Sequence, residues 1–315
     1  MSCVGRVVES TRYVVENSDH VRIDDDEIQR FAEDIGAGSK VELPDWEASY
    51  HFKDVVRPDA TAQYVFVVDA LNFCFWPLEG YEYEHLALAF KLVLERDPEG
   101  LSCEKLESMT EERLEGILLQ AWNDPGLSQP PLLKERVRLL KELGQGLREN
   151  FQGQALNVVK AAHYDSLQLA QLVIDNFPGF RDQAMFKGHD VFLYKRCQIL
   201  VGDIEGALKG TQGFPGLSNI EKITCFADYR LPQLLRFHRM LKYSHELSNL
   251  VDQKVELKPG SSFEVEIRAA TIHAVARLSE ILGERMYAVD WLLWNTAETQ
   301  RNTLPAHHLT LTTFY

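Results

Sequence analysis

The feature that most constrains the fold of this chain is the spacing of its apolar residues, which is helical along most of its length. In residues 85–95 (HLALAFKLVLE) apolar side chains recur every three or four positions, the period of one helix face. Pro131 begins a longer amphipathic stretch that ends near residue 151, and proline is favoured in the first helical turn. The same period predicts helices over residues 166–177, 190–208, 232–243, 264–282 and 287–298.

Two short motifs predict helix starts, and one segment departs from the helical pattern. Residues 108–111 and 218–221 both match the Ser-x-x-Glu capping box. Residues 64–70 (YVFVVDA) are β-branched and aromatic, which is typical of a short strand, although a buried helical turn fits equally well. We therefore expect a mainly α fold in one domain over residues 1–315, with at most a short β element near 64–70. Two helical lobes would meet near residues 155–165.

The charge balance excludes several classes of protein. Of 315 residues, 33 are Lys or Arg and 47 are Asp or Glu, which gives a net charge of −14. Polymeric nucleic acid is usually bound by a basic surface, so this balance disfavours such a partner. No apolar run is long enough to span a membrane, and residues 1–25 lack the pattern of a secretion signal. We expect a cytoplasmic protein.

The cysteines support the same location. There are five of them, scattered and without any Cys-x-x-Cys pair: Cys3, Cys74, Cys103, Cys197 and Cys225. An odd, dispersed set of this kind is typical of reduced, buried thiols in a cytosolic protein. A chain of this length also buries enough apolar surface to fold without disulfides or a structural metal.

The segment CFADYRLPQ (225–233) is the first candidate for a functional site. It brings together an aromatic ring, a carboxylate, a phenol and a guanidinium, those of Phe226, Asp228, Tyr229 and Arg230. Pro232 predicts a new helix, so Asp228 would lie just before a helix start. Such an aspartate often only caps the helix, but its neighbours favour a carboxylate presented at the mouth of a cleft.

A second candidate is the segment DWLLW (290–294), in which an aspartate interrupts an apolar helix. Trp294 lies one turn after Asp290 and shares its helix face. An isolated buried carboxylate is costly, so Asp290 must be solvated, paired or functional. Tryptophans in such a helix, here Trp291 and Trp294, are more often core residues than platforms for a base.

Three further positions carry polar groups that need an explanation. Lys195 and Arg196 lie within FLYKRCQI (192–199), where they form either a solvated helix face or a site for a phosphate. Asn72 lies within the apolar run DALNFCFW (69–76) and needs a hydrogen-bonding partner. His51 follows Tyr50 without any ligand spacing and by itself is an ordinary histidine.

Motifs of the common enzyme classes are absent from the sequence. It has no P-loop, no dinucleotide-binding glycine motif, no zinc-protease motif and no serine-hydrolase elbow. We therefore expect neither a metal nor an organic cofactor. The residues alone suit a small planar ligand, cationic or similar to a nucleobase, and do not determine the reaction.

Taken together, these stretches resemble the queuosine salvage family, the queuosine 5′-monophosphate N-glycosylase/hydrolases. The resemblance extends over residues 50 to 300, and the segment between Trp76 and Gly100 looks shorter than in animal members. It is carried by DALNFCFW (69–76), FP (177–178), FRD (180–182), FLYKRCQ (192–198), FADYRLPQ (226–233), EVEIR (264–268) and DWLLW (290–294).

The resemblance implies a fold similar to that of helix-hairpin-helix DNA glycosylases. It also implies hydrolysis of the N-glycosidic bond of queuosine 5′-monophosphate, which releases queuine and ribose 5-phosphate. A separate transglycosylase can then return queuine to tRNA. The partner would be this small molecule and neither a polymeric nucleic acid nor a membrane, and a monomer is the simplest expectation.

Roles for individual residues follow from the same resemblance. Asp228 would stabilise or attack the cationic sugar that forms as the bond breaks, and Lys195 would assist it. Phe226 and Trp294 would flank the base, and Asp290 would accept hydrogen bonds from the base or from its ammonium group.

The remaining assignments concern the base edge and the phosphate. His51 would hydrogen-bond the base or its cyclopentene diol, and Tyr229 and Asn72 would complete the substrate site. An acidic protein that binds a phosphorylated ligand needs a local cationic pocket, which we expect at Lys195, Arg196 and Arg230.

Two other functions remain open on the sequence. A DNA-repair glycosylase would need a glycine-rich hairpin and a basic surface, whereas residues 213–216 (GFPG) match such a hairpin poorly and the net charge opposes it. A non-catalytic helical module that binds partner helices also fits the apolar pattern.

Overall fold

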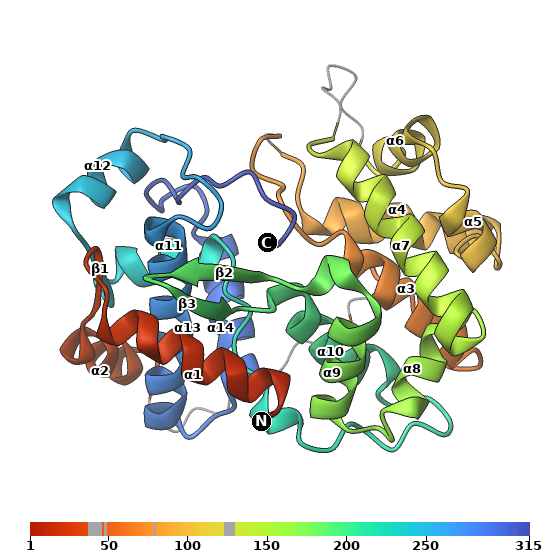
Figure 1. Cartoon of the computed structure of the whole chain (residues 1–315), viewed down its shortest axis with the longest axis horizontal. Helices are drawn as coiled ribbons and strands as arrows, with labels where there is room; N and C mark the ends of the chain where they lie inside the picture. The colour runs from red at the N-terminus through yellow and green to blue at the C-terminus, as the bar shows by residue number, and fades with distance from the viewer. Residues whose placement is uncertain (37–45, 47–48, 79, 123–129) are drawn as a thin grey trace.

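The computed structural model describes residues 1–36, 46, 49–78, 80–122 and 130–315, and these residues form a mainly helical structure (Figure 1). The mainly α prediction is thus confirmed. In chain order the elements are α1 (Cys3–Glu16), β1 (Val21–Ile23), α2 (Asp25–Asp34), α3 (Pro58–Ala70), α4 (Tyr83–Arg96), α5 (Cys103–Glu107), α6 (Glu111–Leu119), α7 (Leu133–Phe151), α8 (Ala155–Ala161), α9 (Ser166–Asn176), the 3₁₀ helix η1 (Pro178–Phe180), β2 (Gln183–Phe186), β3 (His189–Phe192), α10 (Lys195–Leu208), the 3₁₀ helix η2 (Ile220–Lys222), α11 (Arg230–Phe237), β4 (Leu241–Tyr243), α12 (His245–Asp252), α13 (Ser262–Leu282) and α14 (Met286–Thr299).

The prediction of a β element near residues 64–70 is wrong, and the alternative of a helix is correct. These residues form the second half of α3, in which every side chain from Ala60 to Ala70 is buried. A helix that is enclosed on all sides carries apolar residues all round. Its composition therefore imitates that of a buried strand, although its backbone is helical.

Five of the predicted helices, which correspond to α4, α7, α9, α13 and α14, are confirmed, and two are shorter than predicted. Residues 189–192 pair with residues 183–186 as an antiparallel hairpin, so α10 begins only at Lys195. Both turn residues of this hairpin, Lys187 and Gly188, have positive φ, the geometry that suits a two-residue hairpin turn. Residues 241–243 pair with β1 as strand β4, so α11 ends at Phe237.

Both predicted capping boxes are wrong. Ser108 is the C-terminal cap of α5, and the hydroxyl of Thr110 caps α6 by accepting from the amide of Arg113 at 3.2 Å. At the second motif, Asn219 precedes the short η2, and Ser218 instead donates its amide to the carbonyl of Tyr164. In each case a neighbouring polar residue occupies the capping position.

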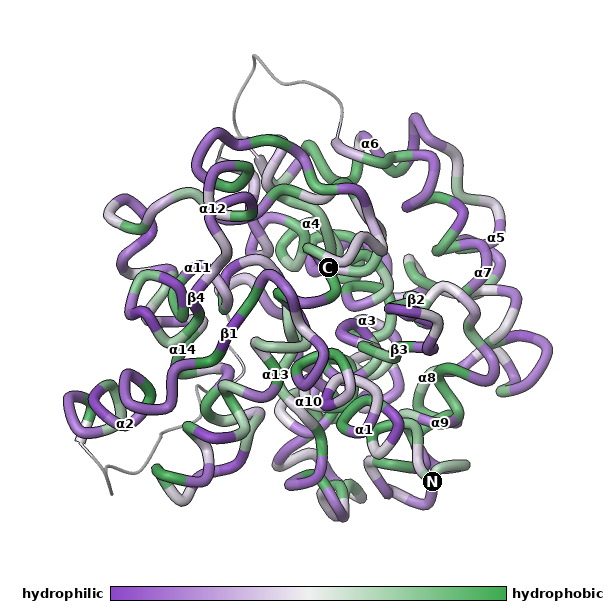
Figure 2. Tube along the Cα trace, turned by 60° about the vertical axis from the view of Figure 1, so that its left-hand side comes forward, coloured by the Kyte–Doolittle hydropathy of each residue, from purple (hydrophilic) through white to green (hydrophobic). Residues whose placement is uncertain are grey.

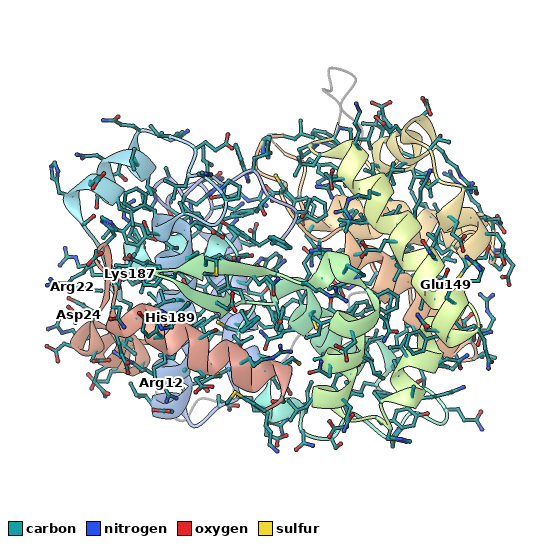
Figure 3. The ribbon with its side chains drawn as sticks, viewed as in Figure 1. Arg12, Arg22, Asp24, Glu149, Lys187 and His189 are labelled. Atoms are coloured by element: carbon teal, nitrogen blue, oxygen red, sulfur yellow. The ribbon has the colours of Figure 1, made fainter. Side chains whose placement is uncertain are left out.

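The small β2–β3 hairpin lies across α1 on one face of the molecule (Figure 3). Lys187, in its turn, forms an ion pair of 2.7 Å with Asp19, and the ring of His189 packs 3.9 Å from that of Tyr13. This hairpin leads directly into α10 and so helps to place the first residue of that helix, Lys195.

A connected hydrophobic core runs through the described helices. Peripheral helices such as α2 alternate hydrophilic and hydrophobic residues along the trace (Figure 2), as burial of one face requires. Helix α3 packs against α10, and α13 packs against α1, α2 and α14. The chain returns at Tyr315 to the middle of the molecule (Figure 1).

All five cysteines are buried and none is in a disulfide, which confirms the prediction of free, buried thiols. Burial raises the pKa of Cys3, Cys74 and Cys103 to about 11. No helix within the described ranges is long and apolar enough to cross a bilayer. Over the same ranges, no group of three or more His, Cys, Asp or Glu side chains is placed to hold a metal ion.

Candidate active site

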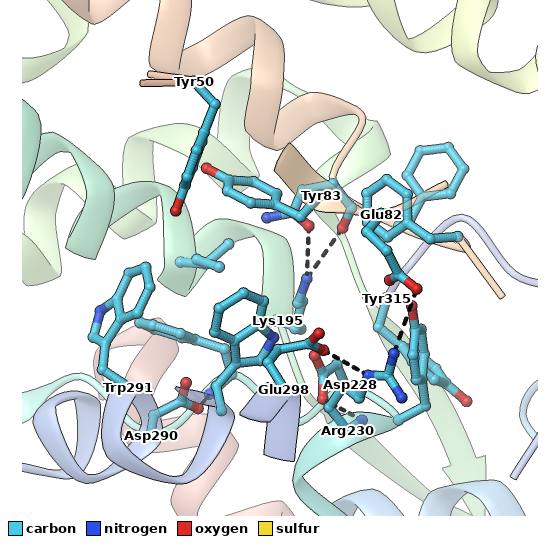
Figure 4. A pocket seen from close by; sticks show the side chains of 17 residues that line it. Tyr50, Glu82, Tyr83, Lys195, Asp228, Arg230, Asp290, Trp291, Glu298 and Tyr315 are labelled. Atoms are coloured by element: carbon cyan, nitrogen blue, oxygen red, sulfur yellow. Dashed lines mark hydrogen bonds and ion pairs between the residues drawn. The ribbon is translucent and has the colours of Figure 1, made fainter. Parts of the chain in front are cut away.

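A cavity with about 730 Å³ of empty space, partly open to solvent, lies between the α3–α4 side of the molecule and the α11–α14 side (Figure 4). It gathers side chains from segments more than 200 residues apart. Its walls are formed by Tyr50, Asn72, Phe73, Phe75, Glu82, Tyr83, Lys195, Ile199, Phe226, Asp228, Tyr229, Arg230, Asp290, Trp291, Trp294, Glu298 and Tyr315.

Most of the residues singled out in the sequence meet at this cavity. The structure brings together Asn72, Lys195, Phe226, Asp228, Tyr229, Arg230, Asp290 and Trp294. Two expected members, His51 and Arg196, do not line it.

Asp228 lies at the start of α11, where one oxygen caps the helix and the other does not. Its Oδ1 accepts hydrogen bonds from the backbone amides of Arg230 (2.7 Å) and Leu231 (3.1 Å). Its Oδ2 accepts no hydrogen bond from any residue that the structure describes. Burial raises the pKa of Asp228, and the charge of Lys195 and the two amides oppose this rise. The capping interpretation and the functional one are therefore compatible, because the two oxygens have different surroundings.

Lys195 is the first residue of α10 and is almost fully buried. Its ammonium donates to the backbone carbonyl of Asn72 at 3.1 Å and approaches the side-chain oxygen of Asn72 at 3.4 Å. Its own amide donates to Asp182 at 3.2 Å. Burial lowers the pKa of Lys195, whereas the neighbouring carboxyl groups, above all Asp228, raise it.

The loop that carries Asn72 is held by arginines from other helices. Arg136, on α7, donates to the carbonyls of Leu71, Phe73 and Cys74 at 2.6–3.1 Å. Arg196 donates to the carbonyls of Ala70 (2.6 Å) and Gly179. The expectation that Arg196 belongs to a cationic pocket is therefore wrong, because its guanidinium is buried against backbone at the end of α3.

Asp290, on α14, is almost fully buried at the wall of the cavity. Its Oδ2 accepts the backbone amide of Phe226 at 2.6 Å. Burial raises the pKa of Asp290 to about 8. The carboxyl group is therefore largely protonated at neutral pH and can donate a hydrogen bond as well as accept one.

Arg230 faces the cavity and lies between two glutamates, Glu82 and Glu298 (Figure 4). Its Nε lies 2.8 Å from Glu298, and its Nη2 lies 3.5 Å from Glu82. Arg301 joins the same two glutamates at 2.6 Å and 3.1 Å. The charge of Arg230 is thus already balanced by the glutamates.

Sequence reasoning missed both glutamates. Glu298 had a signal, because Asp290, Trp294 and Glu298 follow one another at four-residue spacing along one face of α14. Glu82 had none, since it reaches Arg230 only through the tertiary fold. The cavity also takes up aromatic rings to which we assigned no role from the sequence, those of Tyr50, Phe73, Phe75, Tyr83 and Tyr315.

His51 lies behind the cavity wall and touches Tyr83, which lines it. The His51 Nε2 and the Tyr83 hydroxyl are 2.9 Å apart, and the His51 ring stacks on Trp46 at 3.8 Å. Burial lowers the pKa of His51 to about 3, so the ring is neutral. His51 also packs on Tyr50 at 4.4 Å, so its influence on a ligand in this cavity can pass through Tyr83 or Tyr50.

The charges and rings of the cavity indicate the ligand class. Four carboxyl groups (Glu82, Asp228, Asp290 and Glu298) face two cations (Lys195 and Arg230), between aromatic walls. Aromatic walls with a few fixed polar groups are typical of sites for planar heterocycles. A carboxylate with a free oxygen next to a buried ammonium can stabilise a cationic transition state.

Comparison with known proteins gives one consistent result. A family model described as "Queuosine salvage protein" matches residues 50–315. A protein of Dictyostelium discoideum is 36% identical, and the alignment covers 98% of each chain. A protein of Sphaerobacter thermophilus is 37% identical over 98% of this chain and 97% of the relative. A protein of Bos taurus is 33% identical over 95% of this chain and 96% of the relative. Each of the three is named queuosine 5′-phosphate N-glycosylase/hydrolase. The chain therefore belongs to the queuosine salvage protein family.

Proposed function

We propose that this protein hydrolyses the N-glycosidic bond of queuosine 5′-monophosphate and releases queuine. The names of its relatives state this activity for those proteins. The observation that carries the proposal here is the free oxygen of Asp228 beside Lys195 in an aromatic cavity. The products are the free base and ribose 5-phosphate.

The chemistry requires stabilisation on both sides of the breaking bond. As the bond from the anomeric carbon to the base nitrogen breaks, its electron pair moves to the base and the sugar becomes cationic. The Oδ2 of Asp228 stabilises this cation or attacks it. Water then adds its oxygen to the anomeric carbon, and its proton balances the one taken up by the base.

The leaving base needs hydrogen bonds along its edge. It is a 7-deazaguanine, which lacks the ring nitrogen that ordinary purines protonate. Asp290, which carries a proton at neutral pH, can donate to this edge. This role differs from the pure acceptor expected from the sequence. Phe226 and Trp294 provide the walls for the ring.

We assign Arg230 to the 5′-phosphate of the substrate. Lys195 would lie nearer the sugar. Lys195 is buried next to Asp228 and Asn72. Arg230 lies beside the more open Arg301. Phosphate binding at Arg230 would release Glu298 or Glu82 from it.

The direct test is incubation with queuosine 5′-monophosphate followed by chromatography for free queuine. Asp228→Asn should keep substrate binding and lose about 10²–10³-fold in kcat, the cost of removing one stabilising group from a transition state. Asp165→Asn is the matched control, because Asp165 also caps a helix (α9) but lies outside the cavity. Equal losses of kcat in both variants would mean that Asp228 only caps helix α11.

The proposal also includes the domain organisation, location and oligomeric state of the protein. We propose a single domain, which the connected core supports, with two helical lobes that meet near residues 155–165. It would act as a cytoplasmic monomer on a free nucleotide.

Release of a damaged base from duplex DNA would instead favour the alternative of a DNA-repair-like glycosylase. Absence of turnover on any nucleotide would favour the non-catalytic module.

A further inference from the structure

A second pair of carboxyl groups lies behind the cavity without lining it. Asp69, near the end of α3, is 0% exposed, and Asp203, in the middle of α10, is 2% exposed. The two side chains hydrogen-bond to each other where α3 packs on α10. Two carboxyl groups that share a dry site cannot both ionise, so the pair holds one proton between them.

A short chain of contacts connects this pair to Lys195. The Asp69 Oδ1 accepts from the side-chain amide of Asn72 at 3.3 Å. The backbone and side-chain oxygens of Asn72 face the Lys195 ammonium at 3.1 Å and 3.4 Å. The side chain of Asn72 meets both neighbours in one orientation only, with its NH₂ toward Asp69 and its oxygen toward Lys195.

The charged and titratable groups around the pair come from four helices. Lys195 and Arg196 lie on α10, Tyr64 on α3, Tyr83 on α4 and Asp290 on α14. Arg196 is bound to two backbone carbonyls, and Asp290 to a backbone amide. The positive charge of Lys195 is therefore the one most stabilised by the negative charge of the pair, together with the negative charge of Asp228.

We propose that Asp69 and Asp203 are positioning residues for the reaction at Asp228. Their shared proton holds one carboxyl group against the other, and this fixes the amide of Asn72. The remaining negative charge and Asn72 then keep the Lys195 ammonium charged and in place beside Asp228. This role rests on the proposed function, although its effect on Lys195 is measurable without turnover.

This positioning role also predicts how kcat depends on pH. Burial raises the pKa of Asp69 to about 7. The hydrogen bond between the two carboxyl groups lowers the pKa of Asp69 and helps to raise that of Asp203 well above its usual value, so Asp203 carries the shared proton. Below about pH 7 Asp69 also takes up a proton, and the pair loses the negative charge that faces Lys195. We therefore expect the contribution of the pair to kcat to be lost as the pH falls below about 7.

Two substitutions of similar size separate positioning from simple packing. In Asp203→Asn the new amide donates to Asp69 and replaces the shared proton, so the variant should keep most of its kcat. In Asp203→Leu nothing holds Asp69, and kcat should fall about ten- to hundredfold, the usual cost of a misplaced catalytic group, with KM little changed. Glu266→Gln is the control, because Glu266 is equally buried but binds Ser18 and His20, away from the cavity.

The deciding measurements are the pH profile of kcat and the NMR titration of Lys195 in protein labelled at lysine side-chain carbons. The acid-side fall that belongs to Asp69 should stay in place in Asp203→Asn and move to higher pH in Asp203→Leu, in which Asp69 loses its hydrogen bond. The alkaline fall due to Asp290 should stay in both variants. The titration midpoint of Lys195 should drop in Asp203→Leu and stay in Asp203→Asn. A folded Asp203→Leu protein with unchanged kcat and an unchanged Lys195 midpoint would overturn the proposal. If the wild-type protein released no queuine, only the proposed function would fail, because the Lys195 midpoint would still test the pair.

Discussion

Arg268 and Asp182 form a buried ion pair that joins the segments carrying the two candidate catalytic residues. The guanidinium of Arg268 binds both oxygens of Asp182, at 2.5 Å and 3.0 Å, and its Nε donates to the carbonyl of Ala227 at 3.1 Å. Asp182 in turn accepts the amide of Lys195 at 3.2 Å. The pair thus fixes the backbone at both residues of the interacting Lys195 and Asp228 charges.

Loss of this ion pair should be costly for stability. Arg268→Met leaves Asp182 buried without its partner, and we expect a decrease of about 3–5 kcal/mol in the free energy of unfolding, measured by urea denaturation. Arg277→Met, on the same helix, removes an exposed pair with Asp25 and should cost no more than about 1 kcal/mol. Similar decreases in the free energy of unfolding in both variants would show that the buried pair contributes no more to stability than the exposed one.

The phosphate assignment predicts a selective effect of Arg230. Arg230→Gln should lower kcat/KM for the nucleotide about ten- to hundredfold, since a hydrogen bond to a charged group contributes about 1.5–3 kcal/mol. The nucleoside should be affected much less. Arg236→Gln, on the same helix and paired with Asp252 outside the cavity, is the control. An equal loss for nucleotide and nucleoside in Arg230→Gln would place the phosphate elsewhere.

Asp290 should make the protein less stable as the pH rises. Its pKa is 3.8 in the unfolded chain and about 8 in the folded protein. Between these values the unfolded chain has released the proton and the folded protein still holds it, so stability is lost as the pH rises toward 8. Asp290→Asn lacks this loss and can still accept the amide of Phe226.

The measurement is urea denaturation of both proteins at pH 5, 6, 7 and 8. The stability of Asp290→Asn relative to wild type should rise steadily over this range and level off above it. Other titrating groups are common to both proteins and cancel in the difference. A constant difference would mean that Asp290 is ionised in the folded protein.

The polar influence of His51 on catalysis should pass through the hydroxyl of Tyr83, since a phenylalanine ring at position 51 would keep the packing on Tyr50. His51→Phe keeps the stacking on Trp46 and removes the contact with the Tyr83 hydroxyl. We expect a change in stability of about 1 kcal/mol or less, and a loss in kcat/KM that disappears when Tyr83 is already phenylalanine. A double-mutant cycle measures this coupling. Fully additive effects would mean that His51 acts independently of Tyr83, either directly on the substrate or through Tyr50.

Local sequence patterns were enough to predict most of the helices and several of the cavity residues. The periods of α4, α7, α9, α13 and α14 are local, and they are set by which face each helix buries. The sequence motifs also contained Lys195, Asp228 and Asp290, because polar groups in apolar surroundings need a reason. The β2–β3 hairpin had only its Lys187-Gly188 turn as a local signal, and we predicted a helix over β3 instead.

Only the tertiary structure decided which partner each buried charge meets. Lys195 and Arg196 are adjacent and both almost fully buried, yet one faces the cavity and the other holds backbone carbonyls at the end of α3. Arg230 meets Glu82, and Asp69 meets Asp203, across more than 130 residues of chain. Helical periodicity reports that a side chain is buried. It carries no information on what lies opposite, because that depends on how distant helices pack.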